Sequence, residues 1–197
     1  LTAATGMDAL THAVEAYTNL FASKYVQNTA REAVYTIFQT LPRAVENGED
    51  LEARGKMLHA SMQAGIAFTN NFVGYVHALA HAIGGLYGVP HGKANAVLLP
   101  AVFDEFGKSA YKKLSQLAAV IGVEKATEQE SAAAFLAAVR ELRETVKMPE
   151  NFPELRPADY DQLINHAMKE ANPMYPVPEI WGRESFLRVL RAVTPKN

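Results

Sequence analysis

Residues 6–17 read GMDALTHAVEAY, and they set the helical character of the chain. Their apolar residues recur at the spacing of a helix, without the alternation that is typical of a strand. Asp8 and His12 are four residues apart, so on a helix both side chains project from one face and are within reach of one ion. The stretch therefore predicts a helix that is apolar on most sides and presents two polar groups together.

The same periodicity continues along most of the 197 residues, which predicts an all-α, helical-bundle domain. Pro42 should kink or divide the second helix, because proline removes a backbone donor and clashes with the preceding turn. The proline-containing stretches 148–157 and 172–178 are expected to be ordered loops. The helices are expected at residues 6–19, 24–46, 50–69, 74–87, 92–100, 108–121, 128–146, 157–170 and 183–192.

Composition excludes several classes of function. With 49% hydrophobic residues, 20% charged residues and no cysteine, the chain is expected to form one soluble domain whose core needs no disulfide. The absence of cysteine excludes iron–sulfur clusters, thiolate-bound zinc and cysteine nucleophiles. A formal charge of −2 and the lack of a long apolar run argue against nucleic-acid and membrane partners, so we expect a cytoplasmic protein.

A second segment, residues 74–81 (GYVHALAH), places His77 and His81 four residues apart on another largely apolar helix. Glycines in the following turn could fold His91 back beside them. Burying an aspartate and several imidazoles without partners is costly, and a divalent cation is the simplest compensation. Three neutral imidazoles with one carboxylate suit zinc or iron(II), whereas calcium and magnesium prefer more oxygen ligands.

These polar residues also have an interpretation without a metal. Each four-residue pair could be hydrogen-bonded without a metal, but the two pairs together with His91 favour a metal site. His59 and His166 lie in mixed or amphipathic segments and are not expected to be ligands. Residues 140–144 (RELRE) are expected to form a solvated helix face with i, i+4 ion pairs.

Three segments closely resemble the signature stretches of the iron-containing, or group III, alcohol dehydrogenases: residues 6–17, 74–81 and 90–100 (PHGKANAVLLP). The resemblance covers the whole chain. It implies the helical domain of the iron-containing alcohol dehydrogenase and dehydroquinate-synthase-like architecture, in which a separate N-terminal α/β domain carries most of the nucleotide site. By similarity, the metal ligands would be Asp8, His12, His77 and His91.

The resemblance also implies further roles and partners. His81 matches a family histidine beside the metal and the nicotinamide, and we expect it to relay a proton. Phe68 lies where the family has an aromatic residue that lines the alcohol pocket. The expected cofactors are Fe²⁺, with Zn²⁺ as an alternative, and NAD or NADP bound mainly by the other domain; cofactor-binding residues of this chain are not assigned. The substrate would be a small alcohol or aldehyde, and the full-length protein is expected to be a homo-oligomer.

The chain begins at Leu1 without an initiator methionine, so we expect it to be the C-terminal part of a longer polypeptide, or else a trimmed small protein. Residues 1–197 are expected to form a single helical metal-binding domain that is inactive without the nucleotide-binding domain. One alternative is a catalytically inactive metal-binding fragment. Another is a polyol or glycerol dehydrogenase, or a lyase, of the same superfamily; residues 6–17 and 90–96 favour alcohol dehydrogenase. The particular alcohol, NAD against NADP, and iron against zinc stay open.

Overall fold

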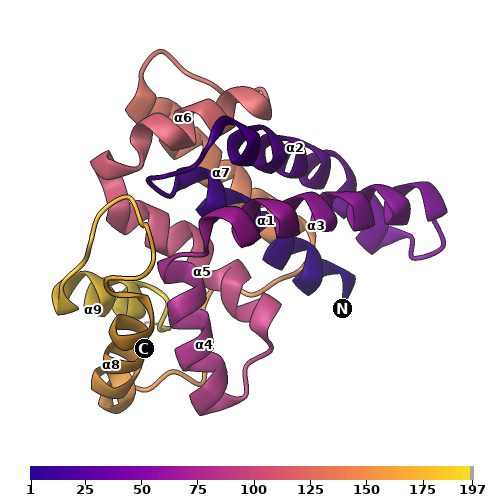
Figure 1. Ribbon diagram of the computed structural model, residues 1–197. Helices are drawn as coiled ribbons and strands as arrows, with labels where there is room; N and C mark the ends of the chain where they lie inside the picture. Colours follow the sequence, from indigo (N-terminus) through magenta and orange to yellow (C-terminus); the bar gives the residue numbers. More distant parts are fainter. Residues whose placement is uncertain (196–197) are drawn as a thin grey trace.

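Helices alone build the fold over the part of the chain that the computed structural model describes, residues 1–195. No strand occurs in this range, which confirms the all-α prediction. In chain order the elements are α1 (Thr2–Thr18), α2 (Lys24–Glu46), α3 (Leu51–Asn71), α4 (Tyr75–Tyr87), α5 (His91–Phe106), the 3-10 helix η1 (Gly107–Ser109), α6 (Tyr111–Val120), α7 (Glu128–Thr145), the 3-10 helix η2 (Pro157–Asp159), α8 (Tyr160–Ala171) and α9 (Arg183–Ala192) (Figure 1).

Prolines interrupt the helices less than the sequence predicts. The helix α5 continues past its internal Pro100 to Phe106. Separately from the prolines, α1 begins at Thr2, four residues earlier than predicted. Pro42 lies inside α2 without dividing it, which corrects the expectation of a divided helix. Leu41 and Ala44 are buried on either side of Pro42, so packing holds this last part of α2 although one backbone hydrogen bond is lost.

The helices form two groups that meet at α5 (Figure 1). In the first group α1 packs against α2 and α3, while α6 and α7 pack against each other. In the second group α4 packs against α5 and α8, and α9 packs against α5. Because α1 also packs along α5, the three helices α1, α4 and α5 are neighbours in the middle of the molecule (Figure 1).

Glycine brings the start of α5 into contact with the backbone of α1. A Cβ atom at Gly92 would lie 2.7 Å from the carbonyl carbon of Ala4, closer than real side chains approach. The backbone cannot move aside as a flexible side chain can, so this contact sets the distance between the two helices. Asp8 lies one turn beyond Ala4, and His91 is the neighbour of Gly92, so the contact also places these two side chains.

Buried polar side chains fix the segments around α4. Asn19 is 1% exposed and donates from Nδ2 to the carbonyls of Asn71 at 2.9 Å and Val73 at 3.1 Å, just before α4 begins. Tyr75, in the first turn of α4, donates to Oδ1 of Asn172 at 2.6 Å and accepts from the backbone N–H of Trp181 at 3.1 Å. The segment between α8 and α9 is therefore fastened to α4.

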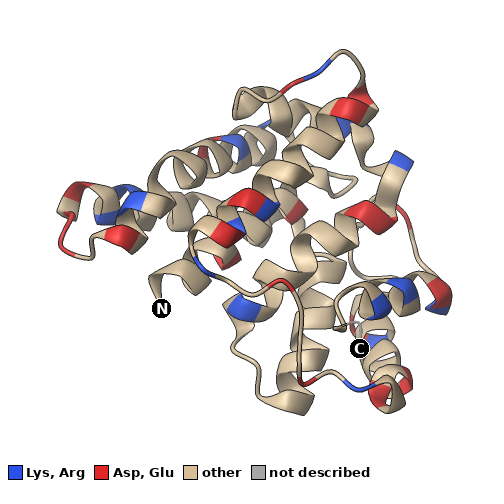
Figure 2. Ribbon diagram, turned by 180° about the vertical axis from the view of Figure 1, so that it is seen from behind, with Lys and Arg blue, Asp and Glu red and all other residues tan. Residues whose placement is uncertain are grey.

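The hydropathy of the helices and the distribution of charge bear on the expectations for membrane and nucleic-acid partners. Within residues 1–195, no helix combines the length and the hydropathy that crossing a bilayer requires. On the side shown in Figure 2, basic and acidic segments are interspersed over the helices.

Candidate metal centre

Four side chains predicted as ligands converge in the middle of the fold. One ligating atom from each of Asp8, His12, His77 and His91 lies within 4.8 Å of all the others. Asp8 Oδ2 is 3.7 Å from His12 Nε2, and Asp8 Oδ1 is 3.7 Å from His77 Nε2 and 3.4 Å from His91 Nε2. The structure thus brings together residues that are separated by up to 83 positions in the chain, and it does so with one carboxylate facing three imidazoles.

The helices explain this convergence. Asp8 and His12 are one turn apart on α1, as the spacing predicts. His77 is in the first turn of α4, and His91 is the first residue of α5. Since α5 rests on α1 at Gly92, His91 is carried to the carboxylate of Asp8.

Glu15 contacts His77 on the side of the ring that faces away from Asp8, and it was not predicted from the sequence. Its carboxylate is 2% exposed and lies 2.5 Å from Nδ1 of His77. It also accepts backbone N–H groups at the start of α4, from Gly74 at 2.9 Å and Val76 at 2.7 Å. A signal was available, because Glu15 is an acidic residue in the middle of the buried face of α1 and so needs partners.

Asn95 is a second side chain of the cluster that the sequence analysis missed. It is fully buried one turn after His91, and its Nδ2 donates to Asp8 Oδ1 at 2.5 Å. The same nitrogen is 3.2 Å from His77 Nε2 and 3.1 Å from His91 Nε2. The i, i+4 spacing from His91 could have indicated it, since that spacing puts both residues on one face of α5.

The pKa values of the imidazoles diverge because their surroundings differ. Burial by itself would lower the pKa of His77, but the carboxylates of Glu15 and Asp8 outweigh it and raise the pKa to about 9. Burial, reinforced by the neighbouring His77, lowers the pKa of His12 to about 4. Without an ion at neutral pH, a second proton is therefore favoured on His77, between two carboxylates. The cluster is an environment for positive charge, and a divalent cation would take the place of that proton.

Two buried polar atoms of the cluster have no hydrogen-bond partner among the described residues: His12 Nδ1 and Asn95 Oδ1. Such atoms are unusual in folded proteins and mark places where a group is expected. The ring of His12 is held between Phe68 and His77, with ring centroids 4.2 Å from each. Phe68, on α3, thus lies directly against a candidate ligand. One carboxylate and three imidazoles with these partners fit a four-coordinate transition metal such as zinc or iron(II).

His81 lies beside the cluster but outside it. Its ring is stacked on that of His91 with centroids 5.1 Å apart, and its side chain is 46% exposed. Nδ1 is 2.8 Å from the carboxylate of Glu170 on α8, which also accepts a hydrogen bond from Tyr175 at 2.8 Å. Burial tends to raise the pKa of Glu170, but the hydrogen bonds from His81 and Tyr175 outweigh it and lower the pKa.

His59 and His166 are exposed and do not belong to the cluster, in agreement with the sequence analysis.

The interpretation of residues 140–144 as a solvated face needs a correction. Arg143 is only 9% exposed, and Arg140 pairs with Asp104 on α5 rather than along its own helix.

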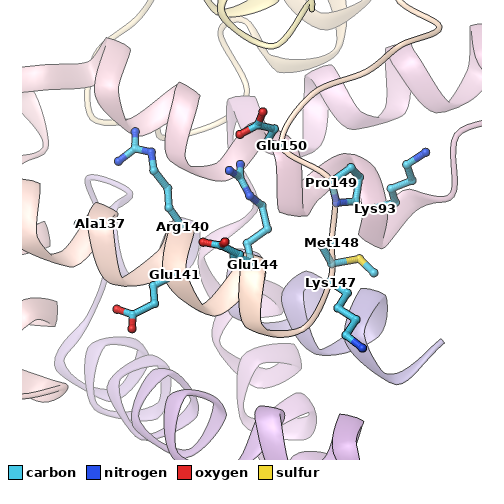
Figure 3. Close-up of a pocket in the computed structure, with 10 residues that line it drawn as sticks. Lys93, Ala137, Arg140, Glu141, Glu144, Lys147, Met148, Pro149 and Glu150 are labelled. Carbon is cyan, nitrogen blue, oxygen red and sulfur yellow. The ribbon is translucent and has the colours of Figure 1, made fainter.

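Arg143 and its neighbours line a surface depression of about 900 Å³, which we call the α7 pocket (Figure 3). Figure 3 shows charged side chains standing out from α7 and from the segment that follows it. No member of the metal cluster lines the pocket. Its lining residues are Lys93, Ala137, Arg140, Glu141, Arg143, Glu144, Lys147, Met148, Pro149 and Glu150.

Comparison with known proteins agrees with this geometry. Residues 2–194 match the model of the Fe-containing alcohol dehydrogenase family, C-terminal. Alcohol dehydrogenase 4 of Schizosaccharomyces pombe is 44% identical over 89% of this chain and 43% of its own length. The 1,3-propanediol dehydrogenase of Klebsiella pneumoniae is 41% identical over 87% of this chain and 46% of its own length.

A solved structure of 1,3-propanediol oxidoreductase superposes with a TM-score of 0.92 at 37% identity, covering 97% of this chain and 51% of that one. The chain therefore spans about half the length of the relatives that it matches.

Proposed function

The chain belongs to the Fe-containing alcohol dehydrogenase family, and from this premise we propose that it is the metal-binding, C-terminal half of an NAD(P)-dependent alcohol dehydrogenase. The enzyme would interconvert alcohols with aldehydes or ketones by hydride transfer. The observation that carries this proposal is the cluster of Asp8, His12, His77 and His91, whose ligating atoms lie within 4.8 Å of one another.

Asp8, His12, His77 and His91 would hold the metal, with Fe²⁺ as the expected ion and Zn²⁺ as an alternative that the same donors suit. A divalent ion held there would supply a Lewis acid that lowers the pKa of an alcohol and polarises the carbonyl of an aldehyde or ketone. The buried helices α1 and α4 keep the cluster in a fixed geometry, so little rearrangement is needed when substrate binds.

His81 would be the catalytic residue that carries the proton between substrate and solvent. Its position between the cluster and the surface supports this role, since its ring touches His91 and its side chain is half-exposed. Glu170 holds Nδ1, which leaves Nε2 as the nitrogen that can take up and release a proton.

Phe68 would bind substrate by covering one side of the His12 ring with an apolar surface. Such a surface excludes water and favours a small carbon chain over a highly hydrated one. The relatives named as alcohol and 1,3-propanediol dehydrogenases support a small alcohol or diol, in preference to a polyol or glycerol dehydrogenase or a lyase.

Residues outside this chain would bind most of the NAD or NADP, and the complete protein would be a cytoplasmic homo-oligomer. The nucleotide part of this proposal is supported by the chain spanning less than half of the two curated relatives. In the complete polypeptide we expect tight nucleotide binding, whereas the present chain alone would bind metal but bind NAD weakly and turn over no alcohol. Strong NAD binding by residues 1–197 alone would contradict this division of roles.

Elemental mass spectrometry of protein purified without air or chelator tests the proposal. We expect about one equivalent of iron or zinc, as for a single four-ligand site. His77→Ala should lose this metal, and the matched control His166→Ala, at an exposed histidine outside the cluster, should keep it. His81→Ala should keep the metal and lower the turnover of the complete enzyme. Retention of the metal by His77→Ala would refute the ligand assignment.

A further inference from the structure

Glu15 is the most deeply buried charged side chain near the cluster, at 2% exposure. All the donors that it faces belong to the first turn of α4 or to the residue before it: the backbone N–H groups of Gly74 and Val76, and Nδ1 of His77. A buried carboxylate without such partners would be strongly unfavourable. The three donors therefore fix where the carboxylate lies, and the carboxylate in turn fixes the ring.

The position of Glu15 decides which nitrogen of His77 is available. The carboxylate lies 2.5 Å from Nδ1, where it accepts the N–H of that nitrogen, so in the neutral ring Nε2 carries the free lone pair. Nε2 is also the nitrogen that faces Asp8 and Asn95. The ring is thereby held in the tautomer that offers Nε2 to the cluster.

A glycine makes room for this arrangement. A Cβ atom at Gly74 would lie 2.8 Å from Oε1 of Glu15, so a side chain at position 74 would push the carboxylate away from α4. The two motifs that were read separately in the sequence, residues 6–17 and 74–81, therefore meet at this carboxylate.

We propose that Glu15 is a positioning residue of the metal centre, which holds His77 in the Nε2-donating tautomer and adds a second buried negative charge beside the cluster. The proposal rests on the metal-ligand role proposed for His77. With Asp8, Glu15 balances the two positive charges of a divalent ion, whereas the ligands alone supply one negative charge. Charge balance of this kind favours retention of the ion, and it acts most strongly on the side of the site where Glu15 and His77 are buried.

The test compares Glu15→Gln with wild type in chelator-competition titrations with Zn²⁺ and Co²⁺. Glutamine has the same size but only one acceptor oxygen, and its NH₂ group would either face a backbone donor or donate to Nδ1 and move the ring proton to Nε2. We expect metal affinity to fall about 10- to 100-fold, as for other partners of ligating histidines. The absorption spectrum of the bound Co²⁺ should also change.

Asn19→Ala is the matched control. Asn19 is buried like Glu15 and holds the segment just before α4, but it contacts carbonyls and does not touch His77. We expect it to lower the melting temperature of the metal-free protein without changing metal affinity per folded molecule. If Glu15→Gln behaves in the same way as Asn19→Ala, Glu15 only supports the fold and the proposal is overturned.

A measurement on wild-type protein covers the case in which Glu15→Gln does not fold. In ¹⁵N-histidine-labelled, zinc-loaded protein, long-range ¹H–¹⁵N spectra should show His77 protonated at Nδ1; a proton on Nε2 would overturn the proposal. These outcomes are distinct from failure of the proposed function. If wild type binds no metal, the function fails; if wild type and Glu15→Gln bind equally well, only the role of Glu15 fails.

Discussion

The candidate metal centre and the α7 pocket both contain charged and polar side chains. They differ in whether the partners of these side chains are protein groups or solvent. The α7 pocket is a depression of about 900 Å³, and most of its charged lining residues are exposed: Glu141, Glu144, Lys147 and Glu150 (Figure 3). In the cluster, the buried Glu15 and Asn95 lie within hydrogen-bond distance of imidazole nitrogens, and Asn95 also donates to Asp8. The volume of a surface depression therefore does not identify the candidate functional site. Chemistry is expected where burial forces polar groups to face one another.

We expect the largest effect on the candidate metal centre from a substitution at the backbone contact between α1 and α5. Gly92→Ala places a methyl group against the carbonyl of Ala4, and neither backbone can yield without moving α5. Overpacking of this kind costs about 1–3 kcal/mol of unfolding free energy, and the shift of His91 should also weaken metal binding. Chemical denaturation and chelator competition measure the two effects.

Gly85→Ala is the control for this prediction, since nothing lies within 4 Å of a Cβ atom at Gly85. It should leave metal affinity unchanged. Equal metal affinity in Gly92→Ala and Gly85→Ala would show that the contact with Ala4 does not set the geometry of the cluster.

Glu170→Gln tests a partly exposed carboxylate beside the cluster, and we expect a smaller effect on stability than at Gly92. The folded state lowers the pKa of Glu170, so the carboxylate contributes stability that is present above the pKa of the unfolded chain and is lost as pH falls through the folded pKa. Because this side chain is 31% exposed, we expect less than about 1 kcal/mol. Denaturation of metal-free protein between pH 3 and 7 should show the difference from wild type shrinking below about pH 4.5. A difference that stays constant over this range would contradict the assignment.

The smallest effect is expected in the α7 pocket. Arg143→Met keeps the buried aliphatic stem while removing a guanidinium whose pKa burial lowers. We expect the unfolding free energy to change by less than about 1 kcal/mol and metal affinity to stay the same. A tenfold loss of metal affinity, measured by the same chelator competition, would mean that the two regions are coupled.

Helix positions were largely predictable, because apolar periodicity reports which face each helix buries. Pro100 was an exception, since α5 continues to Phe106 where the prediction ended at residue 100. At Pro42 the predicted range 24–46 was right and only the division of the helix was wrong, because packing on both sides of a proline can hold a helix that its local chemistry disfavours. The exposure of Arg143 was mispredicted for a related reason. Periodicity along α7 does not reveal that the rest of the fold buries this charged side chain.

For the candidate site, short-range spacing identified the side chains but not their partners. Asp8 and His12 are paired by one helical turn, and His77 and His91 were found in conspicuous motifs. Glu15 acts across 62 positions on His77, a contact that no local pattern encodes. The charge of the site was consequently underestimated from sequence, since only the carboxylate of Asp8 was counted.

The start of α4 has a consequence for dissecting this protein into peptides. Gly74, the residue before α4, offers no side chain to cap the helix, and the carboxylate that receives the N–H groups there belongs to α1. A synthetic peptide of residues 74–92 would carry three of the histidines at their natural spacing. It would still lack the group that secures its first turn, and short isolated helices are marginal in water. We therefore expect metal binding from the assembled chain and not from the isolated peptide, so peptide mapping would miss the proposed site.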